Sequence, residues 1–251
     1  LDRLNEKGFI ETPPPELVEV MGRALTYSTM TDGAFDVTVA PLLELYASHF
    51  EASNRPPPDH EVERILESVD YRKVQVDEDA IVLEGSEMKV TLDGIAKGYI
   101  VDQTVRALVD DGAERILINA GGDMASGGDG SLEDPWTVGV RDPAEPQVLL
   151  ANVRLGGECI ATSGDYMQAF THDRRFHHII DPRTGYSPSQ ASAVTVVTTS
   201  AMEADALSTG IMVLGPVEGF QLMKRLEDTE GMIVTKGGES MTTPGLDNLA
   251  V

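Results

Sequence analysis

Short strand-like segments dominate the chain between Trp136 and Thr198, and this pattern limits the possible folds more strongly than any other feature. Asp-Pro, Gly-Gly and Thr-Gly turns separate the segments, which leaves few of the helical crossovers that parallel strands require. The sequence therefore predicts an α+β fold with mixed, mostly antiparallel sheets and packed helices, and it disfavours a doubly wound parallel sheet. The predicted strands of this region are residues 136–140, 148–155, 158–161, 176–180 and 192–198.

Apolar residues at helical spacing predict helices on both sides of this region. Val20, Met21 and Ala24, for example, share one face of a helix that follows a run of prolines and stops before Asp32-Gly33. Gly215-Pro216 predicts a break between two helices near the C-terminus. The predicted helices are residues 17–28, 59–69, 100–108, 202–214 and 217–226. We also expect a small antiparallel meander over residues 71–92, a strand over 115–119 and a last hairpin from residue 232.

The charge of the chain excludes several classes of partner. Lys and Arg total 19 against 42 Asp and Glu, which gives a formal net charge of −23. So acidic a chain repels phosphate backbones and anionic lipid, so we expect no nucleic-acid partner. No stretch approaches the roughly 20 apolar residues of a membrane-spanning helix, so no direct membrane insertion is expected. The single cysteine, Cys159, excludes an internal disulfide framework, and its neighbours predict a buried strand thiol.

The segment from Gly94 to Gly98 opens a predicted helix. Glycines at such a junction let backbone N–H groups approach an anion, and the positive end of the helix dipole together with Lys97 would favour a phosphate. The alternative is a tight turn with a surface lysine, because the spacing matches neither the Walker nor the Rossmann pattern. Both interpretations stay open on these residues alone.

Asp205 and Thr209 are four residues apart in a predicted helix, so their side chains lie on one face. A carboxylate and a hydroxyl are hard oxygen ligands suited to Mg²⁺. In the structural alternative, Asp205 complements the N-terminal end of its helix and Thr209 bonds back to a carbonyl of the same helix.

His177 and His178 are neighbours in a predicted strand, so they point to opposite faces and one of them should lie at a cleft beside Asp181. A histidine there could accept a hydroxyl proton near neutral pH, oriented by Asp181 or another carboxylate. The alternative is a surface histidine pair. A serine-hydrolase triad is disfavoured because the chain has no Gly-x-Ser-x-Gly motif.

Taken together, six short segments resemble the motifs of the ApbE family of FAD:protein FMN transferases, and they occur in the same order. The resemblance runs from about residue 28 to the C-terminal helices. One such motif would be weak evidence, but six colinear motifs are specific. The segments are Gly33–Asp36, Gly94–Tyr99, Asn119–Asp123, Ala161–Tyr166, His178–Gly185 and Ala204–Thr209.

The resemblance implies a Mg²⁺-dependent enzyme that passes FMN from FAD, through a phosphoester bond, to a Ser or Thr hydroxyl of an acceptor protein and releases AMP. It makes His178 the catalytic residue, as a base or a charge stabiliser. The residues that it places at FAD are Ala34, Phe35, Asp36 and Lys97. The metal ligands that it implies are the backbone carbonyl of Gly94 and the side chains of Asp205 and Thr209.

The sequence departs from the family pattern in two places. The family usually reads Asp-Leu-Gly-Gly where this chain has Thr91-Leu92-Asp93-Gly94. The resemblance also implies that the chain, taken as a single ApbE-like domain over residues 1–251, lacks an N-terminal segment of the family. Two alternatives therefore stay open: a metal-dependent FAD pyrophosphatase that gives FMN and AMP, and a non-catalytic FAD-binding protein.

Members of the family commonly act outside the cytoplasm on membrane-bound redox complexes. The resemblance therefore implies an acceptor protein with a Ser/Thr flavinylation motif, such as a subunit of a membrane redox complex. It also implies an extracytoplasmic location, either periplasmic or membrane-attached.

Overall fold

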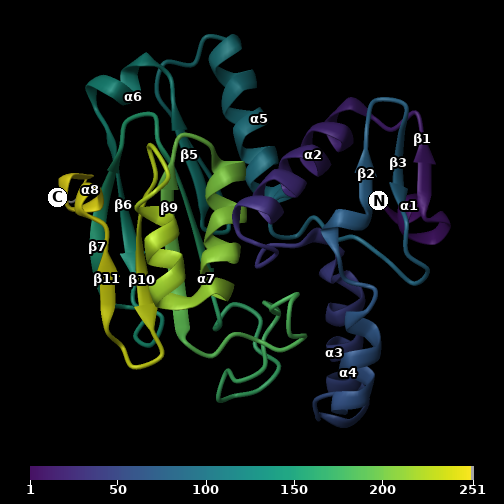
Figure 1. Cartoon of the computed structure of the whole chain (residues 1–251). Coiled ribbons are helices and arrows are strands. Elements are labelled where there is room, and N and C mark those ends of the chain that lie inside the picture. The colour runs from purple at the N-terminus through teal and green to yellow at the C-terminus, as the bar shows by residue number, and fades with distance from the viewer. Residues whose placement is uncertain (250–251) are drawn as a thin grey trace. The chain divides into compact units, whose positions relative to one another are not determined.

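A computed structural model describes residues 1–249, and the contacts within the chain divide it into two compact units (Figure 1). The first unit comprises Leu1–Gly94 and Gln168–Pro188, and the second comprises Ile95–Met167 and the chain from Ser189 onward. Each unit is therefore built from separate stretches of sequence. The prediction of one domain over the whole chain stays a prediction.

The first unit consists of helices and one small sheet. Three strands form an antiparallel sheet in the order β1-β3-β2, in which Ile81 of β3 is paired with both Ile10 and Val76. The predicted meander is thus confirmed for β2 and β3, whereas β1 was not predicted from the sequence. The elements are α1 (Asp2–Lys7), β1 (Phe9–Glu11), α2 (Pro15–Met30), a 3₁₀ turn (Val37–Val39), α3 (Ala40–Ser53), α4 (Asp59–Leu66), a 3₁₀ turn (Tyr71–Lys73), β2 (Val74–Val76) and β3 (Ala80–Leu83).

The returning segment, residues 168–188, joins the first unit through aromatic packing. The rings of Phe50 and Phe170 stack with centroids 5.1 Å apart and planes 1° from parallel, and Phe176 packs on Tyr46. The predicted strand over residues 176–180 is wrong, because only an isolated bridge between Ala169 and His177 forms there. The segment folds back on itself and packs the partly buried Phe170 and Phe176 against α3 rather than extending along a sheet.

The second unit is built on a six-stranded antiparallel sheet in the order β11-β10-β9-β8-β5-β4, and a separate hairpin pairs β6 with β7. The α+β fold predicted from the sequence is confirmed, and every strand pairing in residues 1–249 is antiparallel. The elements are α5 (Ala96–Asp110), β4 (Ile116–Ala120), β5 (Asp123–Gly127), α6 (Asp129–Glu133), β6 (Trp136–Arg141), β7 (Leu149–Leu155), β8 (Cys159–Gly164), β9 (Ala191–Thr198), α7 (Ala201–Met223), β10 (Glu230–Thr235), β11 (Ser240–Thr242) and α8 (Pro244–Leu249).

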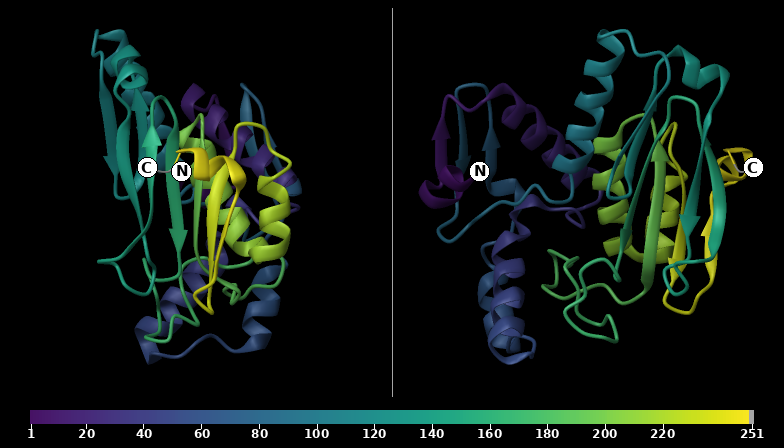
Figure 2. Two further views of the ribbon diagram at one scale, coloured as in Figure 1. Left: turned by 90° about the vertical axis from the view of Figure 1, so that its left-hand side faces the viewer. Right: turned by 180° about the vertical axis from the view of Figure 1, so that it is seen from behind.

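Two layers cover the six-stranded sheet of the second unit (Figure 2). Helices α5 and α7 pack on one face, and the β6–β7 hairpin packs on the other face through Val138, Val153 and Leu155. Cys159 of β8 is the buried strand thiol that the sequence predicted, and burial raises its pKa to about 12. No helix among the described residues has the length and apolar character needed to cross a membrane.

Helix α7 contains the break that Gly215-Pro216 predicted. Gly215 has φ 79° and ψ 180°, which is outside the helical region and inaccessible to most side-chain-bearing residues. The residues before the break, including Asp205 and Thr209, form a regular helical segment that packs against β8 and β9.

Candidate functional site

In the second unit, a buried carboxylate of α5 caps the N-terminus of α7. Asp102 accepts hydrogen bonds from Ser200 Oγ at 2.7 Å and from the backbone N–H groups of Ala201 and Met202 at 2.8 and 3.0 Å. The first N–H groups of a helix have no partner inside the helix, and a negative charge there opposes the positive end of the helix dipole. Asp102 therefore fixes the position at which α7 begins.

The reverse contact runs from α7 to the N-terminus of α5. The backbone N–H of Gly98, in the first turn of α5, donates to Asp205 Oδ2 at 3.1 Å. A Cβ atom at Gly98 would lie 2.2 Å from the carbonyl oxygen of Ala201, so only glycine allows this approach of the two helices. The two helices thus cap each other, since Asp102 of α5 caps α7 and Asp205 of α7 caps α5.

Thr209 lies one turn after Asp205, as predicted, and its hydroxyl contacts β8. The Thr209 Oγ1 atom is 3.0 Å from Ser163 Oγ, which is itself 2.8 Å from Ser208 Oγ. The described structure gives the Thr209 hydroxyl this side-chain contact rather than the predicted alternative of a bond to a carbonyl of its own helix. Asp205 and Thr209 together present carboxylate and hydroxyl oxygens from one helix face, which are donors that suit Mg²⁺.

Lys97 pairs with a buried carboxylate. Its Nζ lies 2.9 Å from Asp123 Oδ2, at the start of β5 and directly after the Gly121-Gly122 turn. Burial raises the pKa of Asp123 above 3.8, and the neighbouring Lys97 charge opposes that rise. Because the Lys97 side chain is 44% exposed, it keeps access to solvent while Asp123 holds its position.

In the first unit, the carboxylate of Asp36 accepts hydrogen bonds from other residues of that unit. Its Oδ1 accepts from the backbone N–H and the hydroxyl of Thr38, at 2.8 and 2.7 Å, and its Oδ2 accepts from the N–H of Tyr71 at 2.9 Å. Burial raises the pKa of Asp36 above 3.8, whereas these hydrogen bonds lower it. The neighbouring Ala34 and Phe35 are buried as well. Asp36 therefore shapes the turn after Gly33 and ties it to residue 71.

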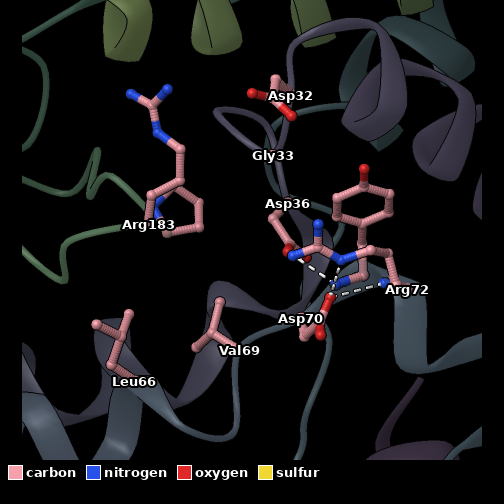
Figure 3. A pocket seen from close by; sticks show the side chains of 10 residues that line it. Asp32, Gly33, Asp36, Leu66, Val69, Asp70, Arg72 and Arg183 are labelled. Carbon is pink, nitrogen blue, oxygen red and sulfur yellow. Dashed lines mark hydrogen bonds and ion pairs between the residues drawn. The ribbon is translucent and has the colours of Figure 1, made fainter.

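A pocket of about 280 Å³ lies beside this turn in the first unit (Figure 3). Arg183 of the returning segment is one of its lining residues, and both oxygens of Asp181 hold the guanidinium at 2.9 Å. Asp181 thus pairs with Arg183 rather than with a histidine. The residues that line the pocket are Asp32, Gly33, Asp36, Leu66, Val69, Asp70, Tyr71, Arg72, Pro182 and Arg183.

The two histidines differ in environment, but strand alternation is not the reason, because no strand forms there. His177 is fully buried, with its Nε2 3.2 Å from the carbonyl oxygen of Pro188. His178 is partly exposed, and its Nδ1 lies 3.3 Å from the carbonyl oxygen of Gln168. In the tautomer in which Nδ1 donates to that carbonyl, Nε2 carries the lone pair that could accept a proton.

The segment that departs from the family pattern is irregular. The Thr91 N–H donates to the carbonyl of Val37 at 2.8 Å, and Thr91 Oγ1 accepts from the N–H of Asp93 at 3.2 Å. Thr91 therefore anchors this segment to the 3₁₀ turn after Asp36. Its hydroxyl makes a local contact that a longer carboxylate at this position would change.

The structure groups the predicted site residues by unit. Lys97, Asp205 and Thr209 belong to the second unit. The first unit holds Ala34, Phe35, Asp36, Gly94 and His178. Sequence reasoning missed Asp102, Asp123, Ser163 and Arg183 as supporting residues; the last three lie inside motif segments, and that was the available signal.

Known proteins resemble this chain over most of its length. The family described as the ApbE family matches residues 1–233. The FAD:protein FMN transferase of Klebsiella pneumoniae is 32% identical over 214 residues, which cover 83% of this chain and 66% of that protein. The FAD:protein FMN transferase of Escherichia coli K12 is 30% identical over 238 residues, which cover 90% of this chain and 67% of that protein. The chain thus spans about two thirds of the length of these relatives.

Solved structures agree in fold. The ApbE protein of Thermotoga maritima superposes with a TM-score of 0.90 at 29% identity, covering 100% of this chain and 83% of that one. The apo form of the Pseudomonas stutzeri flavinyl transferase ApbE has a TM-score of 0.85 at 28% identity, covering 99% of this chain and 79% of that one. The family match, the identity to the curated relatives and the shared fold all point the same way, and this chain belongs to the ApbE family.

Proposed function

We propose that the protein transfers FMN from FAD to a Ser or Thr hydroxyl of an acceptor protein and releases AMP. Relatives that are 32% and 30% identical bear the name FAD:protein FMN transferase. The structural observation that carries the proposal is the pairing of α5 and α7, in which Asp205 and Thr209 share one helix face beside the N-terminus of α5. Lys97 stands in the first turn of that helix.

The donor set fits Mg²⁺. Asp205 and Thr209 offer hard oxygen atoms, and the resemblance adds the backbone carbonyl of Gly94. So few protein ligands suit a cation that keeps several waters and takes further oxygens from substrate phosphates. A bound Mg²⁺ would supply neutralisation of charge on those phosphate oxygens.

The transfer replaces the phosphoanhydride bond between the two halves of FAD with a phosphoester bond to the acceptor. The acceptor hydroxyl oxygen bonds to the FMN-side phosphorus of FAD, the bond from that phosphorus to the bridging oxygen breaks, and AMP leaves with the bridging oxygen. The hydroxyl proton passes to a base, which we assign to His178 Nε2 when Nδ1 donates to Gln168. Lys97, held by Asp123, would stabilise negative charge on the phosphates.

The FAD contacts predicted at Ala34, Phe35 and Asp36 take a particular form in this proposal. Because both carboxylate oxygens of Asp36 accept hydrogen bonds from its own unit, Asp36 would act by holding the backbone of its turn in place for the cofactor. The pocket beside that turn would receive part of FAD, with Arg72 and Arg183 as the positively charged residues of its lining.

The acceptor, in this proposal, is a protein with a Ser/Thr flavinylation motif, such as a subunit of a membrane redox complex. We place the reaction outside the cytoplasm, on the periplasmic side or attached to the membrane. Both statements rest on the resemblance described from the sequence. Cell fractionation followed by detection of covalent flavin in each fraction tests them, and flavinylated acceptor found only in the cytoplasm would contradict the location.

Mixing the protein with FAD, Mg²⁺ and an acceptor domain that exposes a Thr motif tests the reaction. We expect the acceptor to gain the mass of FMN less one water, with one AMP released for each modified acceptor. Asp205→Ala and His178→Ala should each slow AMP release by about 100-fold or more. Glu218→Ala is the control for Asp205→Ala, because Glu218 is an exposed carboxylate of the same helix.

The same assay separates the alternatives. AMP with free FMN and an unmodified acceptor would overturn the transferase in favour of a FAD pyrophosphatase. Metal-independent FAD binding without AMP would overturn it in favour of a flavin-binding protein. Unchanged AMP release in both Asp205→Ala and His178→Ala would overturn the assigned site.

A further inference from the structure

Three hydroxyl groups form a chain between β8 and α7 in the second unit. Ser163 Oγ lies 3.0 Å from Thr209 Oγ1 and 2.8 Å from Ser208 Oγ. Ser208 Oγ in turn lies 3.0 Å from the backbone carbonyl oxygen of Asp205. Ser163 and Ser208 are only 8% and 1% exposed, so their protons are satisfied by protein atoms rather than by bulk water.

The carbonyl of Asp205 sets the direction of this chain, because a carbonyl oxygen can only accept. When Ser208 donates to that carbonyl, the Ser208 oxygen accepts from Ser163, and the Ser163 oxygen accepts from Thr209. All three protons are then used. In the opposite direction the Thr209 proton would need an acceptor other than Ser163, and the described residues offer it none. The Asp205 carbonyl would also lose the bond from Ser208.

The direction of the hydroxyl chain decides where the lone pairs of the Thr209 oxygen point. A hydroxyl oxygen that donates its proton to Ser163 keeps two lone pairs, and they point away from Ser163. A cation binds a hydroxyl through such a lone pair. The Asp205 carbonyl at one end of the chain can only accept a hydrogen bond, and a cation at Thr209 would need that oxygen to keep its lone pairs. Both therefore require that Thr209 donates to Ser163. Hydrogen bonds in a chain of this kind also polarise one another, which strengthens the lone-pair donor at the end.

We propose that Ser163 is a positioning residue, which turns the lone pairs of Thr209 toward the cation by accepting the Thr209 proton. The inference rests on the proposed function, because it takes Thr209 as a metal ligand. Ser163 lies on β8, between β5 and β9 in the six-stranded sheet, so the acceptor is held by a rigid element. Partners that orient metal ligands from outside the metal's own shell typically change metal affinity 10–100-fold when removed.

The same two strands provide a matched control. Thr162 and Thr195, paired across β8 and β9, have their hydroxyl oxygens 2.9 Å apart. Successive side chains of a strand point to opposite faces, so this pair lies on the face of the sheet opposite Ser163. Thr195→Val removes one buried hydroxyl of a hydroxyl pair, as Ser163→Ala does, without touching the chain to Thr209.

Titration of the protein with Mn²⁺, followed by the electron paramagnetic resonance signal of the free ion, tests the inference without any turnover. We expect Ser163→Ala to weaken Mn²⁺ binding by about 10-fold and Ser163→Thr, which keeps the hydroxyl, to restore it to within about threefold. Ser208→Ala should have a smaller effect, because Ser163 still accepts from Thr209 but loses its own acceptor. Thr195→Val should leave the Mn²⁺ affinity unchanged within about twofold.

Thr209→Val separates this inference from the proposed function. If wild-type protein binds no Mn²⁺, or if Thr209→Val binds it as tightly as wild type, the metal site itself is overturned. If Thr209→Val weakens binding but Ser163→Ala does not, only the positioning role of Ser163 is overturned. Equal losses in Ser163→Ala and Thr195→Val would also overturn it, because they would indicate a general effect of lost packing. Circular dichroism of each variant verifies that it is folded.

Discussion

The two units place their buried carboxylates differently. In the first unit, Asp36 binds Thr38 and Asp181 binds Arg183, each two residues away along the chain, and only the bond from Asp36 to Tyr71 is longer in range. In the second unit, the bonds of Asp102 and Asp205 join α5 to α7 across about 100 residues of sequence, with separations of 99 for Asp102 to Ala201 and 107 for Asp205 to Gly98.

This difference indicates different tasks for the same side chain. A carboxylate that binds its sequence neighbours fixes the shape of one loop, and its loss should be felt locally. A buried carboxylate that caps a distant helix sets the spacing of two helices, so its loss should move every group on them. In the second unit those groups include the proposed metal ligands.

The largest effect should come from glycine substitutions in the two units. Gly98→Ala places a methyl group 2.2 Å from the Ala201 carbonyl oxygen and should destabilise the protein by about 3 kcal/mol. Gly22→Ala, in α2 of the first unit, meets no atom within 4 Å and should stabilise it by about 0.5–1 kcal/mol. Urea unfolding measures both changes, and Trp136, the single tryptophan, reports the second unit by its fluorescence. If both substitutions changed the free energy of unfolding in the same direction, the contrast between the two units would be contradicted.

The next effect should come from the cap of α7. Asp102→Asn keeps one acceptor oxygen but turns an NH₂ group toward donors, and it removes the charge at the helix N-terminus. We expect the free energy of unfolding to fall by about 2–3 kcal/mol, and Mn²⁺ binding to weaken because α7 carries Asp205 and Thr209. Asp110→Asn, at the exposed end of the same helix, should change stability by less than about 0.5 kcal/mol. Equal effects of the two substitutions would refute the capping role.

Sequence reasoning predicted the parts of this arrangement that depend on local pattern. The break at Gly215-Pro216, the antiparallel strands of the second unit and the shared face of Asp205 and Thr209 all follow from spacing within one element. The strand predicted over residues 176–180 was wrong because Phe176 and Phe170 pack on residues of α3 far away in sequence. Nothing in the local pattern encodes such a contact.

The same reason explains why the supporting residues of the site were missed. Ser163 is 46 residues from Thr209, and Asp102 is 99 residues from Ala201. A motif can indicate that such a residue has a role, as the Ala161–Tyr166 segment did for Ser163, but its partner is set by which strand and helix face each other. The partners become visible only after the sheet order of the second unit is known.

A smaller effect should appear in the pH dependence of the first unit. Burial raises the pKa of Asp36 above 3.8, so the protonated form is favoured in the folded state. The stability that this preference contributes is present below the unfolded pKa and is lost as pH rises through the folded one. From about pH 3.8 upward, the free energy of unfolding should therefore fall more, or rise less, in wild type than in Asp36→Asn.

Urea unfolding at a series of pH values, followed by circular dichroism, measures this slope. Asp173→Asn is the control of opposite sign. The hydroxyl of Thr171 and the N–H of Arg175 lower the pKa of Asp173, so its contribution is present above the unfolded pKa and lost as pH falls. Wild type should then gain more stability than Asp173→Asn as pH rises. If both substitutions changed the slope of the unfolding free energy against pH in the same direction, the pKa directions assigned to Asp36 and Asp173 would be contradicted.

The smallest effect on the free energy of unfolding should come from substituting surface arginines that stack on aromatic rings. This effect should also differ between the units. The Arg115 guanidinium lies 3.7 Å from the centroid of the Trp136 ring and donates from Nε to the Asp134 carbonyl at 2.9 Å. In the first unit Arg72 stands 5.3 Å from the Tyr71 ring, and its side chain is 71% exposed. Lysine keeps the charge of arginine but loses the flat stacking and the fork of donors.

Arg115→Lys should therefore lower the free energy of unfolding by about 0.5–1 kcal/mol and shift the Trp136 emission, because the ring loses its cover. Arg72→Lys should change stability less, because its guanidinium lies farther from the ring and its side chain is mostly exposed. Arg154→Lys, at an exposed position of β7, controls for the exchange of arginine for lysine in the second unit. A loss in Arg72→Lys as large as that in Arg115→Lys would show that stacking distance and exposure do not set the difference. The contrast between the units would then be confined to their buried carboxylates and glycines.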